Sequence, residues 1–256
     1  MSRRPPRILV TNDDGINALG LATLERIALA LSDDVWVVAP ETNQSGAAHS
    51  LTLTRPLRVR RHGERRFSVD GTPTDCVLIA LQSVIEGAPV DLVLSGINHG
   101  GNLGEDVTYS GTVAAAMEAT LFKVPAVALS QICESRQRIK WPTAERWAPL
   151  VIERLLGAPW PEDVLINVNF PDLPADEVQG IRVTAQGKRK IGDTLVERVD
   201  PRGEPYLWIG ALREEAHARP GSDLAAIAEG QVSVTPIHLD MTHHPSFAAL
   251  RSLLED

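Results

Sequence analysis

Two adjacent carboxylates are the residues in this chain that point most directly to chemistry. Asp13 and Asp14 follow the apolar run 7–11 and precede Gly15. Paired acids at the end of a buried strand are costly unless a cation or hydrogen bonds satisfy them. Gly15 gives the backbone the freedom to turn both acids toward one ion. A solvated turn that caps a helix is the alternative, and this segment alone does not decide between the two.

A glycine-rich segment, residues 95–104, follows a second apolar run and carries Asn98 and Asn102. It has neither the G-x-G-x-x-G spacing of a dinucleotide site nor the Gly-Lys-Ser/Thr of a phosphate-binding loop. A predicted helix begins shortly afterwards at Ser110-Gly111-Thr112. Free amides and hydroxyls at a helix N-terminus bind phosphate. We therefore favour a phosphate site here over a tight structural turn.

The polar loop 41–47 follows a third apolar run and contains Ser45. By itself it is best interpreted as an ordinary loop. Together, however, the three segments offer carboxylate, hydroxyl and amide oxygens, which suit Mg²⁺, Mn²⁺ or Ca²⁺ rather than zinc. No pair of histidines has a spacing that competes for such a metal.

A sheet could bring these three segments together, and the spacing of apolar residues along the chain predicts one. The expected strands are residues 7–11, 35–39, 91–95, 125–129, 164–169 and 231–236. The expected helices are residues 19–31, 74–85, 111–122, 143–156, 222–229 and 245–254. Strands that are apolar on both faces and alternate with helices predict a three-layer α/β fold with a parallel sheet. Ligands of such sheets bind at the carboxyl ends of the strands.

Composition limits the class of protein. The 256 residues are 43% hydrophobic and 23% charged, which is typical of a folded globular chain. A net charge of −8 and 4% aromatic residues argue against nucleic acid as a partner. No apolar run reaches the roughly 18 residues of a membrane span. With only two cysteines and no secretion signal, we expect a soluble cytoplasmic protein without a membrane partner.

Residues 51–69 interrupt the α/β pattern and predict a hairpin around residues 62–64. It contains six arginines: Arg55, Arg58, Arg60, Arg61, Arg65 and Arg66. They could collect an anionic substrate, but a solvated hairpin face is the interpretation we favour.

Residues 171–219 are rich in proline, glycine and charge, with strand-like runs at 181–185 and 206–209. A loop-rich stretch of this length suggests an insertion or an oligomerisation element. We expect one domain with a core of about 1–170 plus 221–240, an arm of about 171–220 and a C-terminal helix of about 244–256. Leu207 and Trp208 in the arm, with Phe247, Leu250 and Leu253 in the helix, could cross between subunits. The alternative is an arm that folds back on its own domain, and the residues alone leave both open.

The chain resembles the SurE (survival protein E) family of nucleotidases and phosphatases. The matching segments run nearly the whole length of the chain: residues 8–15, 37–40, 43–46, 50–53, 70–76, 95–98, 102–113, 221–223 and 232–236. The resemblance implies a Rossmann-like core whose C-terminal β arms build homodimers or homotetramers. It also implies a metal-dependent phosphatase that acts on nucleoside 5′-monophosphates, and in some members on 3′-monophosphates or short polyphosphate.

By the same motif match, the family's metal ligands fall on Asp13, Asp14, Ser45 and Asn98, and the expected cofactor is one divalent ion per subunit. Ser110, Gly111 and Thr112 match the segment beside the phosphate. Asn12, Asn43 and Asn102, in the same motifs, complete the candidate substrate contacts.

Asp13 and Asp14 are the candidate catalytic residues. We expect an attacking water as the nucleophile, although an aspartyl-phosphate on either aspartate is the alternative. Two other functions remain open from the sequence. One is a non-catalytic nucleotide or metal sensor on the same fold, and the other is a nucleotide-sugar transferase.

Overall fold

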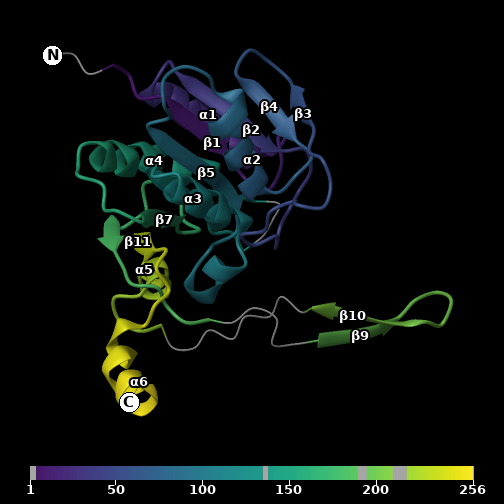
Figure 1. Ribbon diagram of the computed structural model, residues 1–256, viewed down its shortest axis with the longest axis vertical. Coiled ribbons are helices and arrows are strands. Elements are labelled where there is room, and N and C mark those ends of the chain that lie inside the picture. The colour runs from purple at the N-terminus through teal and green to yellow at the C-terminus, as the bar shows by residue number, and fades with distance from the viewer. Residues whose placement is uncertain (1–3, 135–137, 190–194, 210–217, 256) are drawn as a thin grey trace.

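A nine-stranded sheet forms the centre of the protein in the computed structural model, which describes residues 4–134, 138–189, 195–209 and 218–255 (Figure 1). Its strand order is β3-β4-β2-β1-β5-β6-β7-β11-β8, and β9 and β10 form a separate two-stranded sheet. The strands are β1 (Ile8–Thr11), β2 (Val35–Pro40), β3 (Val59–Arg61), β4 (Arg66–Val69), β5 (Leu92–His99), β6 (Ala126–Gln131), β7 (Val164–Phe170), β8 (Ile181–Val183), β9 (Leu195–Val199), β10 (Pro205–Ile209) and β11 (Val232–His238).

The six α-helices of the described part alternate with the strands along the chain. They are α1 (Leu19–Leu31), α2 (Pro73–Ile79), α3 (Gly111–Leu121), α4 (Trp141–Leu156), α5 (Asp223–Ala228) and α6 (Phe247–Leu254). The 3-10 helix η2 (Gly104–Thr108) lies between β5 and α3, and one π-helical turn, η1 (Ala80–Val84), extends α2.

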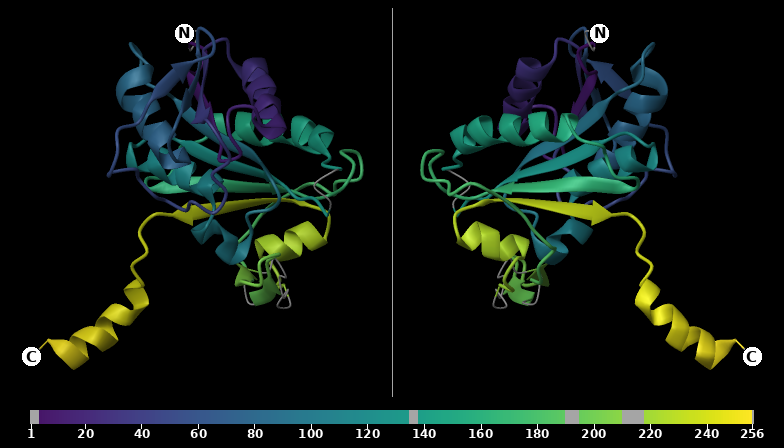
Figure 2. Two further views of the ribbon diagram at one scale, coloured as in Figure 1. Left: turned by 90° about the vertical axis from the view of Figure 1, so that its right-hand side faces the viewer. Right: turned by 90° about the vertical axis from the view of Figure 1, so that its left-hand side faces the viewer.

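Helices cover both faces of the sheet (Figure 2). Because successive residues of a strand point to opposite faces, Ile8 and Val10 pack with α1 and α4, while Leu9 packs with α2 and α3. All three side chains are fully buried. The predicted three-layer α/β fold is confirmed, and strands β4, β2, β1, β5, β6 and β7 are parallel to one another.

The two margins of the sheet depart from the purely parallel arrangement that the sequence predicted. β3 pairs antiparallel with β4, and β11 pairs antiparallel with β7. β8, in the stretch expected to form an arm, instead pairs parallel with β11. The run at 181–185 therefore finds its partner within the main sheet.

β5 is longer than the sequence predicted. The expected strand ended at residue 95, but β5 continues to His99, and Asn98 and His99 pair with Ser130 and Gln131 of β6. The register shifts between Ser95 and Asn98. Gly96 permits this irregularity, because its φ is +139° and a Cβ there would lie 2.3 Å from the carbonyl oxygen of Leu129. Glycine composition alone made this segment resemble a loop.

The arginine-rich hairpin is shorter than expected, since only β3 and β4 of the stretch 51–69 are strands. Five of its arginines lie beside a carboxylate: Arg55 and Arg58 beside Asp70, Arg60 beside Glu41, Arg65 beside Asp34 and Arg66 beside Glu25. The sixth, Arg61, stacks on the Phe67 ring. These pairs neutralise the hairpin locally and support a structural face rather than a collector of anions.

The hairpin β9–β10 extends away from the sheet, and α6 projects in a different direction from the same lower end of the view (Figure 1). The sequence predicted a strand for β10 but not for β9, whose polar residues alternate too irregularly to indicate one. Parts of the expected arm, residues 190–194 and 210–217, lie outside the described residues. So does residue 256, the last residue of the expected C-terminal helix. In the part of the chain that is described, no helix is both long and apolar enough to cross a membrane.

Candidate active site

The candidate site lies where the sheet changes its winding direction. From β1 the chain winds through β2 and β4 toward one margin, then returns to β5 on the other side of β1. The connections after β1 and β5 thus leave the carboxyl edge in opposite directions, and such a switch point is where doubly wound sheets bind ligands. Asp13 and Asp14 follow β1, and Asn98 lies at the end of β5.

Asp13 is held against the start of α3. The Thr112 hydroxyl donates a hydrogen bond of 2.5 Å to Oδ1 of Asp13. Gly111 lets α3 approach this closely, because a Cβ there would lie 2.8 Å from Cβ of Asp13 and 3.1 Å from its Oδ2. The predicted carboxylate and the predicted phosphate segment therefore share one site.

The pKa of Asp13 is raised from its ordinary 3.8 to about 6: burial is the largest cause, the hydrogen bond from Thr112 opposes it, and the negative charge of Asp14 adds to it. Asp13 is only 4% exposed. A carboxylate in this position is poorly stabilised by solvent, and a cation would relieve that cost.

Asp14 lies between the loop after β2 and the end of β5. Its Oδ1 accepts a hydrogen bond from the Asn43 amide at 3.2 Å, and its Oδ2 accepts from the His99 backbone at 3.4 Å. The oxygen of the Asn43 side chain accepts from the backbone N–H of Ser45 at 2.8 Å. The backbone N–H of Gln44 donates to the Asp13 carbonyl at 2.8 Å. These bonds fix the Ser45 loop beside both aspartates.

His99 is a site residue that sequence reasoning left unassigned. Its Nδ1 lies 3.5 Å from Oδ1 of Asp14, and its side chain is 23% exposed. The two residues are 85 positions apart. No spacing rule links them, and only its place inside the glycine-rich segment gave a signal.

Asn98 and Asn102 are fixed differently. The Asn98 amide donates to the Gly100 carbonyl at 2.8 Å, which leaves the side-chain oxygen at the other end of the amide as the atom to serve as ligand. Asn102 is 6% exposed and donates to the Ser130 hydroxyl at 2.7 Å. The backbone carbonyl of Asn102 accepts hydrogen bonds from the side-chain amides of Asn167 at 2.8 Å and Asn169 at 3.1 Å.

Asn167 and Asn169 are fully buried supports that the sequence analysis did not single out. They could have been recognised in the sequence as two amide side chains inside the otherwise apolar strand β7. A buried amide without a function as a ligand usually holds a backbone group, as these two do.

Asn12 and Ser110 use their side chains for local structure. Asn12 is 1% exposed; its amide donates to the Gly15 carbonyl at 3.1 Å, and its oxygen accepts from the Gly15 N–H at 3.2 Å. Ser110 caps α3 by accepting from the Val113 N–H at 3.1 Å. Asn12 thus shapes the turn that carries Asp13 and Asp14, and Ser110 shapes the helix N-terminus opposite.

The donor set fits a hard divalent ion. Carboxylate oxygens of Asp13 and Asp14, the Ser45 hydroxyl and the Asn98 amide oxygen are all hard donors. Hydrogen bonds connect the loop that carries Ser45, and the end of β5 that carries Asn98, to Asp14. Across the described ranges, no three His, Cys, Asp or Glu side chains form a group able to hold a metal. A metal at this site would therefore depend on neutral oxygens in addition to the two aspartates.

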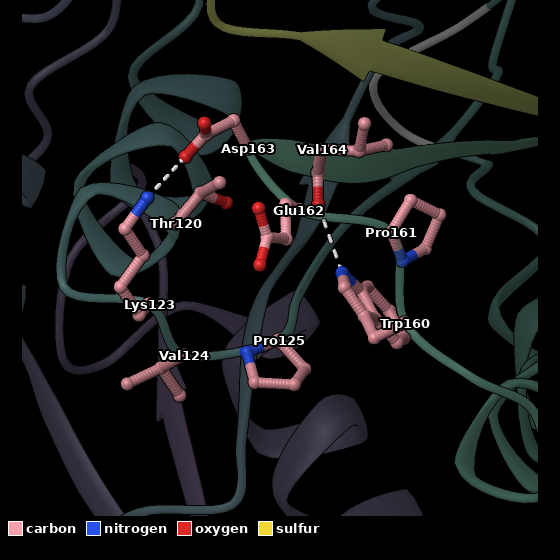
Figure 3. Close-up of a pocket in the computed structure, with 9 residues that line it drawn as sticks. All are labelled: Thr120, Lys123, Val124, Pro125, Trp160, Pro161, Glu162, Asp163 and Val164. Carbon is pink, nitrogen blue, oxygen red and sulfur yellow. Dashed lines mark hydrogen bonds and ion pairs between the residues drawn. The ribbon is translucent and has the colours of Figure 1, made fainter.

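A hollow of about 400 Å³ lies elsewhere, at the amino ends of β6 and β7 (Figure 3). Trp160, Pro161 and Pro125 form its apolar side, and the ion pair between Lys123 and Asp163 spans 2.5 Å at its edge. Because it lies at the opposite ends of these strands, it is separate from the candidate site.

The fold and the site define a class: α/β proteins with an oxygen-rich, carboxylate-centred site at the switch point of a mostly parallel sheet. The family model described as "Survival protein SurE" matches residues 8–193. The chain therefore belongs to the SurE family, as the sequence motifs indicated.

Two relatives and a solved structure match this chain over nearly its full length. A protein of Paramagnetospirillum magneticum named "5'-nucleotidase SurE" is 61% identical over 246 residues, which is 96% of this chain and 95% of that protein. One of the same name from Rhodospirillum rubrum is 58% identical, over 95% of this chain and 94% of that protein. The crystal structure of SurE protein from Aquifex aeolicus superposes with a TM-score of 0.86 at 41% identity, covering 97% of this chain and 99% of that one.

Proposed function

We propose that this protein is a metal-dependent 5′-nucleotidase, which hydrolyses nucleoside monophosphates to nucleoside and phosphate. One observation carries the proposal: the carboxylate of Asp13 and the N-terminus of α3 meet through Thr112 at the switch point. The proposed cation site and the proposed anion site would thus be adjacent, as phosphoryl transfer requires. Relatives that cover the whole chain bear the name of this activity.

Asp13, Asp14, Ser45 and Asn98 are the proposed ligands of one divalent ion, Mg²⁺ or Mn²⁺, with Ca²⁺ as a further candidate. When bound, such an ion would neutralise the charge that develops on the phosphoryl oxygens. The chain's own contribution is to hold two carboxylates at one point before substrate arrives. The hydrogen bonds to Asp13 and Asp14 perform that task.

The start of α3 is the proposed phosphate-binding element. The backbone N–H groups of Gly111 and Thr112 and the Ser110 hydroxyl would hold phosphoryl oxygens, since helix N-termini favour anions. Asn12, Asn43 and Asn102 are proposed as further substrate contacts. Their side chains also make hydrogen bonds that hold the backbone around the site.

Water is the proposed nucleophile. Oδ1 of Asp13 accepts from Thr112, and both oxygens of Asp14 accept from neighbours, so each carboxylate is engaged as an acceptor. An attack by Asp14 would have to give up one of its hydrogen bonds, and an attack by Oδ1 of Asp13 would have to give up the bond from Thr112. Rapid quench during turnover tests this point, because a phosphorylated aspartate would contradict the water mechanism.

A substrate panel tests the function itself. Nucleoside 5′- and 3′-monophosphates and short polyphosphate are assayed with Mg²⁺, Mn²⁺ and Ca²⁺. We expect the 5′-monophosphates to be hydrolysed only with metal, and 3′-monophosphates or polyphosphate to be secondary substrates. Binding without turnover under every metal would indicate a sensor. Tight binding of nucleoside diphosphates with slow monophosphate hydrolysis would indicate a transferase.

A homodimer or homotetramer is the proposed assembly. Leu207, Trp208 and Ile209 of β10 are 62%, 63% and 74% exposed, and Phe247, Leu250 and Leu253 of α6 are exposed as well. Apolar surface of this extent on an extended hairpin and a projecting helix favours burial against another subunit. We further propose a cytoplasmic location, since two cysteines are too few for a disulfide framework.

A further inference from the structure

The segment that leads toward the β9–β10 hairpin is bound to η2, beside the candidate site. The Gln186 side chain donates to the Gly104 carbonyl at 2.8 Å. The Arg189 guanidinium pairs with Oδ2 of Asp106, through Nε at 3.0 Å and through a shorter contact from Nη2. The side chains of Arg189 and Asp106 are only 6% and 3% exposed. An ion pair this deeply buried is screened little by solvent or salt.

A second carboxylate joins the same two segments. Oδ2 of Asp223, at the start of α5, accepts from the Gly104 N–H at 2.8 Å, and Oδ1 accepts from the Gly187 N–H at 2.8 Å. Asp223 is fully buried. Residues 104–106, 187–189 and 223 therefore form one fixed junction, which we call the η2 junction.

Asp106 connects this junction to the start of α3. Its carbonyl accepts from the N–H of Tyr109 at 3.0 Å and from the N–H of Ser110 at 3.1 Å. Ser110 caps α3, and two residues later Thr112 reaches Asp13. The side chain of Asp106 thus faces Arg189 while its backbone sets the turn that carries the proposed phosphate contacts.

We propose that Arg189 is a positioning residue for phosphate: its ion pair with Asp106 fixes η2, and η2 fixes the N–H and hydroxyl groups of Ser110–Thr112. The identity of the bound group rests on the proposed function, whereas the coupling between Arg189 and this segment does not. Two contacts from one planar guanidinium fix orientation in addition to charge. A lysine would retain the charge and lose that orientation.

A merely structural role would affect the whole fold equally, so the test needs a matched control. Arg7 forms a part-buried ion pair with Asp34 at 2.7 Å, at the amino edge of the sheet. Arg189→Met, Arg189→Lys and Arg7→Met are compared with wild type by amide hydrogen exchange of residues 103–112. The inhibition constant of inorganic phosphate and the dissociation constant of Mn²⁺ are measured on the same proteins.

For Arg189→Met we expect faster exchange in residues 103–112 and an increase of about tenfold in the phosphate inhibition constant. The Mn²⁺ dissociation constant should change less than the phosphate inhibition constant, since its proposed ligands lie outside residues 103–112 and feel the change through the Thr112 hydroxyl. Arg189→Lys should be intermediate, and Arg7→Met should resemble wild type. Unchanged exchange and phosphate inhibition in Arg189→Met, or equal changes in Arg7→Met, would overturn the proposal.

Gln186→Ala provides a second route if Arg189→Met does not fold, because it removes a contact to Gly104 without leaving a buried charge unpaired. We expect a smaller increase in exchange, confined to residues 103–112, and unchanged exchange there would contradict the proposal. Hydrogen exchange needs no substrate. If wild type failed to hydrolyse nucleoside monophosphates, the proposed function would fail, and the exchange data would still decide the role of Arg189.

Discussion

The hydroxyl of Thr112 donates a 2.5 Å hydrogen bond to the carboxylate of Asp13, across 99 positions of sequence. This bond joins the end of β1 to the first turn of α3 and so places a candidate cation ligand beside a candidate anion site. Both residues are buried: Thr112 is fully buried, and Asp13 is 4% exposed. The orientation of Asp13 is therefore set by protein groups rather than by solvent.

Thr112→Val should weaken metal binding at mildly acidic pH. The variant keeps the shape of the side chain but removes the bond that opposes the raised pKa of Asp13, so that pKa should rise beyond about 6. A hydrogen bond to a charged group contributes about 1.5–3 kcal/mol, so the Mn²⁺ dissociation constant at pH 6 should rise about tenfold or more. Calorimetric titration measures it. Thr112→Ser, which keeps the hydroxyl, is the control, and equal loss in both variants would argue against this role of the hydroxyl.

Asp13→Asn should stabilise the metal-free protein at neutral pH. Well below pH 3.8, Asp13 is protonated in both the folded and unfolded states, and its burial costs little. Between pH 3.8 and about 6 the unfolded chain ionises before the folded protein does, so wild type loses stability across this range. A shift of about two units corresponds to about 3 kcal/mol.

Urea unfolding with chelator present, at pH 4 and pH 7.5, measures this difference. The variant should gain stability over wild type at pH 7.5 and show almost none of that gain at pH 4. A gain of equal size at both values would mean that the charge of Asp13 is not its cause.

How far the sequence predicts this site depends on the range of the interactions involved. The turn at Asp13-Asp14-Gly15 and the helix start at Ser110 were predicted, because a strand end and a helix cap are local patterns. That the two meet was inferred only from the general rule for parallel sheets. The bond between Thr112 and Asp13 and the contact of His99 with Asp14 depend on three-dimensional packing, which no local pattern encodes.

The same limit explains the errors in the fold. β5 extends through Gly96 because its neighbour β6 supplies hydrogen-bond partners as far as residue 131, whereas its glycines indicated a loop. β8 was expected to lie in the arm because its partner, β11, lies about fifty positions further along the chain. For the arginines of the 51–69 stretch the sequence left an anion collector open beside the favoured hairpin face, because carboxylates such as Glu25 and Asp34 are distant in sequence.

Ser45→Ala and Asn98→Ala should impair activity less than loss of either aspartate. A neutral oxygen contributes less to cation binding than a carboxylate, so each variant should need about tenfold more Mn²⁺ for half-maximal rate. Saturating metal should restore most of the turnover. Metal titrations of activity measure this. Complete loss of turnover at saturating Mn²⁺ would assign these residues to the chemical step itself.

Changing Leu207 and Trp208 to Ser should disrupt the proposed assembly. These side chains are 62% and 63% exposed on β10, and their burial between subunits is the main stabilisation we assign to that contact. Light scattering should show a dimer or tetramer for wild type and a smaller species for the variant. Leu19→Ser, on the exposed side of α1, is the control for lost apolar surface. A 27.8 kDa monomer for wild type, or an unchanged oligomer in the double variant, would contradict this interface.

Nucleoside 5′-monophosphate hydrolysis by Asp13→Asn and Asp14→Asn, with and without chelator, tests the central claim most directly. Each substitution keeps the size of the side chain and removes one negative ligand. We expect turnover to fall by about a thousandfold or more in either variant. EDTA should abolish wild-type turnover, and Mg²⁺ or Mn²⁺ should restore it. Substantial hydrolysis by wild type in EDTA, or near-normal turnover of either variant, would contradict a metal held by Asp13 and Asp14.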